Sequence, residues 1–290
     1  MIKLFLPHTA KSIVVVILLL LVSSLSVSTM IFILNQAAYA HTFTGEESAS
    51  FLSTLRAIQA ESNLVQSNLA SNLTLAQNHA KDVVDIANGN HTFGVLPDEV
   101  SENNKRVSAD ITKGVNDLQT TVNSKPPPTP ADVKSKLDYV NATLQEAITV
   151  RLPKEHLSNF TVSGEATKNL VNETLRQYGL AYGMSAGTGS VGNTTSNKAA
   201  AASSPSTTIT NMSAYQSAQA LVSQSQTMLN QAKTHAPTNQ TSTMTSAISK
   251  VTNDLSQLKN SIDTKSPYDK VASLVQNTIY PDLNAAFNLK

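Results

Sequence analysis

Apolar side chains between residues 44 and 182 recur at steps of three and four positions, the spacing of one face of an α-helix. Four stretches carry such a stripe: 51–86, 100–122, 133–148 and 163–182. Glycine or proline separates each stripe from the next, and Pro97 is expected to open the second helix. The pattern predicts a bundle of about four helices over residues 41–182.

Capping residues indicate where some of these helices start. Thr44 and Glu47 are spaced as a capping box, in which each residue bonds the backbone N–H of the other. Thr129 stands before Pro130, which suits an N-cap followed by the first helical position. The first stripe fits either one long helix or two helices joined near Asn72.

Residues 183–210 interrupt this periodicity. They are rich in Gly, Ser, Thr, Asn and Ala and carry no apolar stripe, which is the composition of a flexible linker. Beyond them, three further stripes occupy residues 215–232, 244–262 and 271–287, with a bend expected at Pro281. No strand pattern of comparable strength occurs. The chain is therefore expected to be all-α, with a second domain of about three helices over residues 211–290.

A short pattern occurs twice in the chain. Residues 111–124 and 248–261 share Ile-x-Lys, Asn-Asp-Leu and Asn-Ser at identical spacing. A helical stripe precedes each copy, and a helix headed by proline follows each. Duplication of a three-helix unit would explain the repeat, and shared helical composition is the alternative.

The first forty residues have the layout of an export signal. Lys3 and Lys11 precede an uncharged run at 13–34, and Ala38 and Ala40 are small residues placed as a signal peptidase requires. The run is 22 residues long, enough for a transmembrane helix, but hydroxyl residues dilute its centre. We favour cleavage after Ala40 and secretion. The alternative is a single-pass anchor with the C-terminal part outside, and both alternatives predict an extracytoplasmic protein.

Composition excludes several classes of site. The chain has no Cys, so disulfides, thiolate metal sites and a cysteine nucleophile are excluded. The first forty residues hold two lysines and no acid, so the remainder has a net charge of −1. This balance gives no reason to expect nucleic acid as a partner. The partners that we expect are the membrane, through an uncleaved N-terminal run, and a protein of the envelope.

The glycosylation triplet Asn-x-Ser/Thr occurs eight times in the chain. The asparagines are Asn72, Asn90, Asn141, Asn159, Asn172, Asn193, Asn211 and Asn239. Abundant Asn, Ser and Thr explain most of these triplets, and glycosylation of several is the functional interpretation. A cysteine-free exported chain with many such triplets resembles archaeal envelope proteins in composition.

Two short motifs match the letters of catalytic sites without their context. Residues 187–192 read G-x-G-x-x-G, but no strand precedes them and no helix opens there. Ser256 and Lys259 have the S-x-x-K spacing of serine acyl enzymes, but the companion elements S-D-N and K-T-G are missing. The sequence therefore predicts no enzyme and no organic cofactor.

Metal binding is the chemistry that the sequence leaves open. His79, Asp82 and Asp85 follow one another at steps of three in a predicted helix, and Glu61 lies in the same stripe region. A solvated polar face is the expected interpretation of the first three, and weak metal binding is the alternative. No Glu-x-x-His occurs, which argues against a di-iron carboxylate centre of the usual bundle type.

A second metal hypothesis concerns the mature amino terminus. Cleavage after Ala40 would make His41 the first residue, which resembles the histidine brace of copper-binding and copper-oxidising envelope proteins. Such a brace needs a second histidine, for which His79, His91, His156 and His235 are the candidates.

Two functions follow from these patterns. The leading hypothesis is an exported, glycosylated, non-catalytic helical protein that serves as a structural or interaction module of the envelope. The alternative is an extracytoplasmic ligand- or metal-binding bundle that serves a transporter or sensor.

Overall fold

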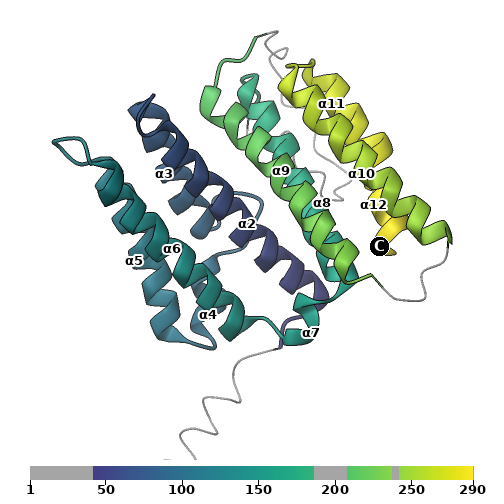
Figure 1. Cartoon of the computed structure of the whole chain (residues 1–290), viewed down its shortest axis with the longest axis horizontal. Coiled ribbons are helices and arrows are strands. Elements are labelled where there is room, and N and C mark those ends of the chain that lie inside the picture. The colour runs from purple at the N-terminus through teal and green to yellow at the C-terminus, as the bar shows by residue number, and fades with distance from the viewer. Residues whose placement is uncertain (1–41, 186–207, 237–241, 290) are drawn as a thin grey trace, which may run out of the picture. The chain divides into compact units, whose positions relative to one another are not determined.

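A computed structural model describes residues 42–185, 208–236 and 242–289 (Figure 1). These ranges form helices and contain no strand, so the predicted all-α class is confirmed. The predicted export signal, His41 and the G-x-G-x-x-G letters lie outside the described residues. The elements are α2 (Gly45–Asn68), α3 (Leu73–Ala87), α4 (Leu96–Ser101), α5 (Lys105–Val122), α6 (Pro130–Arg151), α7 (Lys154–Leu157), α8 (Phe160–Ala181), α9 (Met212–Thr234), α10 (Ser242–Asp263), α11 (Tyr268–Leu274), the π-helix η1 (Val275–Ile279) and α12 (Tyr280–Phe287).

The predicted capping residues start their helices as expected. Thr44 Oγ1 accepts from the backbone N–H of Glu47, and the Glu47 carboxylate accepts from the N–H of Thr44. Thr129 forms the same reciprocal pair with Asp132 at the start of α6. These contacts satisfy N–H groups that would otherwise have no partner in the first turn.

Asparagine caps divide two of the predicted stripes. The first stripe is two helices, because Asn72 caps α3 by accepting from the N–H of Leu75. The expected single helix from Pro97 to Val122 is wrong. Asn104 Oδ1 accepts from the N–H groups of the first turn of α5, so a new helix starts after three residues that separate it from α4.

Two apolar cores hold the described helices together. One core draws on α2 to α6, and the other on α10 to α12. Helices α8 and α9 lie side by side and contribute buried residues to both cores (Figure 1). Thr210 begins this pairing, because its N–H donates to the carbonyl of Ala181 at 2.8 Å.

The described residues from Phe43 onward belong to one compact unit, which contains both cores. The predicted boundary at 183–210 concerns independent folding of the two halves and stays a prediction. Most of that segment lies outside the described residues.

The two copies of the sequence repeat lie on α5 and α10, one in each core. The matched residues Leu118 and Leu255 are both fully buried. Their neighbours differ, since α5 packs on α3, α4 and α6, whereas α10 packs on α9, α11, η1 and α12. Duplication of a three-helix unit is not confirmed.

The last stripe forms three helical segments without an intervening loop. The π-helix η1 ends directly before α12, whose second residue is Pro281. Proline has no N–H to continue an α-helical ladder, and a π turn is one way to accommodate that loss. Of the helices that the structure describes, none is long and apolar enough to cross a bilayer.

Candidate metal centre

His79 lies in the apolar core, so the expectation of a solvated polar face is wrong at this position. The residue is 0% exposed. It shares one face of α3 with Ala76, Ala80 and Val83, which are also buried, because residues three and four apart lie on the same side of a helix. A histidine is thereby held inside the bundle, where it contacts α2 and α9.

Both ring nitrogens of His79 have a partner. Nδ1 lies 2.7 Å from Oε2 of Glu61 on α2, and Nε2 lies 2.9 Å from Oε1 of Gln216 on α9. Burial lowers the pKa of His79, but the hydrogen bond to Glu61, the charge of Glu61 and the bond to Gln216 raise it above its ordinary value. Without a metal, His79 therefore favours the protonated form that donates from both nitrogens.

Glu61 is the incompletely satisfied member of this group. It is 0% exposed, and its Oε1 accepts no hydrogen bond from residues 42–185, 208–236 or 242–289. A buried carboxylate oxygen without a donor is costly, because it has lost its water and gained no partner. The oxygen is therefore available to a cation.

Asp82 adds a second carboxylate beside this pair. One ligand atom each of Glu61, His79 and Asp82 lies within 4.8 Å of the other two. Burial and the negative charge of Glu61 raise the pKa of Asp82 to about 6. Two carboxylates and an imidazole at this spacing form a donor set for a metal ion.

A second group of ligands continues from Asp82 toward the surface. One ligand atom each of Asp82, Asp85 and His91 also lies within 4.8 Å of the other two. These three side chains line a cavity of about 420 Å³. Its further lining residues include Lys81, Asn90, Arg176, Gln177 and Ser213.

His91 is held by a fully hydrogen-bonded glutamate on α8. Its Nδ1 lies 2.9 Å from Oε1 of Glu173 and 2.6 Å from Nη2 of Arg176. Glu173 also accepts from Thr92, Gln177 and both Nε and Nη2 of Arg176. Burial raises the pKa of Glu173, but these bonds and charges outweigh it and hold the pKa at about 2.

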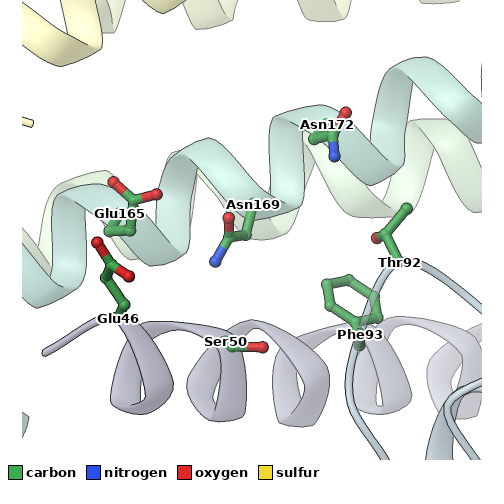
Figure 2. A pocket seen from close by; sticks show the side chains of 7 residues that line it. All are labelled: Glu46, Ser50, Thr92, Phe93, Glu165, Asn169 and Asn172. Carbon is green, nitrogen blue, oxygen red and sulfur yellow. The ribbon is translucent and has the colours of Figure 1, made fainter. Parts of the chain in front are cut away.

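Another polar pocket lies between α2 and α8 and has a volume of about 220 Å³ (Figure 2). Glu46 and Glu165 approach one another across it, and Asn169 and Asn172 line the α8 side. Glu165 is already paired with Lys168, at 3.9 Å. The metal-ligand groups found among the described residues lie elsewhere, around Asp82.

The structure thus brings together four of the five residues proposed from the sequence as metal ligands: Glu61, His79, Asp82 and Asp85. The fifth, His41, lies outside the described residues. The sequence indicated His91 only as a second histidine for His41, and it gave no indication that Gln216 contacts His79. The burial of Glu61 could have been predicted from the sequence. It lies three residues after Ile58 and four before Val65, which are both buried, so it shares their apolar helix face.

Several predicted glycosylation sites have a structural role. Asn72, Asn159 and Asn211 are N-caps whose side-chain oxygens accept backbone N–H groups. These three and Asn90 are exposed, and Asn141 and Asn172 are half-buried. Asn193 and Asn239 lie outside the described residues. Glycosylation stays a prediction, and helix capping gives three of these asparagines a second explanation.

Comparisons with known proteins identify no relative. No protein family, curated protein or solved structure matches the chain significantly.

Proposed function

We propose that this protein is a helical bundle that binds a divalent metal ion through Glu61, His79 and Asp82. The observation that carries the proposal is the buried Oε1 of Glu61, which has no hydrogen-bond donor among the described residues, in a side chain that belongs to a three-ligand group. The sequence has no recognisable catalytic motif and by itself favours a structural module. The ligand group favours the alternative of a metal-binding bundle.

The charges around Glu61 support a cation as the occupant. Glu61 is buried and Asp82 close to it is half-buried, and the raised pKa of Asp82 reflects its desolvation and then the negative charge of Glu61. A divalent ion would stabilise both carboxylates in their charged form. Metal binding would therefore displace the protons held by Asp82 and His79.

The contact with Gln216 indicates which ring nitrogen of His79 would bind the metal. The side-chain oxygen of Gln216 faces Nε2, so Nε2 is the nitrogen that carries a proton in every form. A metal ion would then take the place of the proton that Nδ1 shares with Glu61. Metal-binding histidines commonly donate their other N–H to an oxygen in this way.

The donor types favour a first-row transition metal. Imidazole suits zinc, iron and copper, whereas carboxylates also suit manganese, and thiolates are missing from this chain. Zn²⁺ and Mn²⁺ are the two probes that match a set of one nitrogen and two oxygen donors. We further propose that the N-terminal signal places the site outside the cytoplasm, where the bundle would hold or deliver a metal.

Thermal unfolding tests the binding proposal. The full chain, purified in mild detergent and treated with chelator, is heated with and without Zn²⁺ or Mn²⁺ while helicity is followed by circular dichroism. At a metal concentration 100 times Kd, the native state gains about 2.7 kcal/mol, so Tm rises.

Glu61→Gln removes the charge and keeps the shape of the side chain. We expect it to abolish the Tm shift, whereas Glu165→Gln, in the separate pocket of Figure 2, leaves the shift intact. No shift in the unmodified chain with either metal, or an equal shift in Glu61→Gln, would contradict the proposal.

A further inference from the structure

We propose that the centre holds two metal ions, with Asp82 as the ligand that they share. The inner ion is bound by Glu61, His79 and Asp82, and the outer ion by Asp82, Asp85 and His91. This inference rests on the proposed function, because it adds a second ion to the same site.

Helix geometry places Asp82 between the two groups. On α3, Asp82 lies three residues after His79 and three before Asp85, so it is a neighbour of both, while His79 and Asp85 are rotated apart. Both three-ligand groups found in the described residues contain Asp82. A carboxylate has two oxygens, and each can bind one ion, as in two-metal centres.

His91 meets both an acceptor and a donor at Nδ1, namely Oε1 of the buried Glu173 at 2.9 Å and Nη2 of Arg176 at 2.6 Å. A guanidinium can only donate, so Nδ1 holds a proton toward Glu173 only when the Arg176 donor turns to another acceptor. In that tautomer, Nε2 is the nitrogen that binds an ion. A carboxylate behind a histidine fixes the tautomer and the ring orientation of a ligand in this manner.

The cavity next to the outer group supplies an independent observation. Ser213 of α9 lines this cavity of about 420 Å³ and is only 6% exposed, and its hydroxyl has no hydrogen-bond partner in the part of the chain that the structure describes. A buried hydroxyl without a partner beside a polar cavity is a donor or acceptor for a bound species. We infer that a ligand of the outer ion, such as a water molecule, contacts Ser213.

Lys81 is the competitor for the outer ion. Its ammonium group pairs with Asp85, and it is mostly exposed on the cavity rim. The outer ion must displace this contact, so it is expected to bind more weakly than the inner ion. Lys81→Gln is then expected to strengthen outer binding several-fold and to change inner binding less, because the charge of Lys81 acts on the inner ion only through Asp82.

Manganese stoichiometry tests the inference on the full chain. Chelator-treated protein is equilibrated with Mn²⁺, and bound metal is measured by elemental analysis. We expect about two ions per chain, and about one in Asp85→Asn and in His91→Gln. About one ion in both the unmodified chain and Asp85→Asn would overturn the second ion and leave the proposed function intact. No bound ion in any variant would overturn the proposed function itself.

Electron paramagnetic resonance of the unmodified chain tests the shared ligand and needs no variant to fold. Two Mn²⁺ ions bridged by one carboxylate give a spin-coupled spectrum, which we expect at full loading and which Asp85→Asn should replace by that of an isolated ion. Two bound ions with an uncoupled spectrum would overturn the role of Asp82 as a bridge.

Discussion

Two buried glutamates each contact a histidine, and they differ in how completely their oxygens are used. Glu173 accepts hydrogen bonds at both oxygens, from His91, Thr92, Arg176 and Gln177. Glu61 accepts one bond, from His79, and its other oxygen has no donor. Glu173 therefore has hydrogen-bond partners for both oxygens within the described residues, whereas Glu61 has a partner for only one.

The difference indicates what each glutamate does. A buried carboxylate that is fully hydrogen-bonded and paired with Arg176 stabilises the packing of α8 against the 91–92 segment. A buried carboxylate beside a second acid, with a free oxygen, costs free energy until a cation binds. We therefore interpret Glu173 as a structural and orienting group and Glu61 as a metal ligand.

The largest expected effect is that of Glu173→Gln. The substitution leaves the Arg176 guanidinium buried without a counter-charge, and breaking a buried pair in this way costs about 3–5 kcal/mol. Denaturant unfolding of the metal-free protein measures the loss. Glu165→Gln, on the same helix but half-buried and in loose contact with Lys168, is the matched control and should change stability by less than about 0.5 kcal/mol.

Acid should reveal the same interaction. The pKa of Glu173 is about 2 in the folded protein, below its ordinary 4.5, so the folded state binds fewer protons than the unfolded state between these values. Its contribution is complete above pH 4.5 and is lost as pH falls toward 2, a loss of about 3 kcal/mol. Unfolding free energy measured from pH 7 to pH 2.5 should fall less steeply in Glu173→Gln. Equal slopes would contradict the assignment.

Asp254 is a second buried acid with an oxygen that has no partner among the described residues. Its pKa is shifted in the opposite direction to that of Glu173. Burial is the main cause that raises its pKa to about 6. The hydrogen bond to Asp282 and the charge of Asp282 raise the pKa further, and the charge of Lys250 opposes them. The folded state binds more protons between pH 4 and 6, so stability falls as pH rises through that range. Asp254→Asn should stabilise the protein at pH 7 by an amount on the order of 2 kcal/mol.

Asp117 is the control for this effect, because it occupies the matching position of the sequence repeat. It accepts from Lys113 and Lys136 at the surface, which lowers its pKa against a small opposing effect of burial. Asp117→Asn should reduce stability slightly, by less than about 0.5 kcal/mol. Stabilisation by both substitutions would show that burial of Asp254 is not the cause.

Only a small change in stability is expected for Glu61→Gln in the metal-free protein. The amide oxygen still accepts from His79, and removal of the charge relieves the repulsion with Asp82, so the two effects offset one another. We expect unfolding free energy to change by less than about 1 kcal/mol. A loss of unfolding free energy as large as that of Glu173→Gln would identify Glu61 as a structural group and contradict the distinction between the two glutamates.

The helices were predictable wherever local chemistry decides. The capping boxes at Thr44 and Thr129 and the apolar stripes involve residues within one or two turns of each other, so their pattern is visible in the sequence. The break at Asn104 was missed because Val100 and Val107 are seven residues apart, two turns of a helix, so they share one face even though the residues between them are polar.

The candidate site was only partly predictable. Spacing on one helix brought His79, Asp82 and Asp85 into consideration, but their burial depends on how α2 and α9 pack on α3. Gln216 is 137 residues from His79, and Glu173 is 82 residues from His91. Contacts at such separations leave no local pattern, so only the folded structure assembles them.

Anomalous X-ray scattering from crystals grown with Zn²⁺ tests the metal centre most directly. Difference maps on both sides of the zinc absorption edge locate the ion without reference to activity. We expect a peak bounded by Oε1 of Glu61, Nδ1 of His79 and a carboxylate oxygen of Asp82, and no such peak in Glu61→Gln. A metal-free Glu61 in crystals whose zinc binds only surface residues would contradict it.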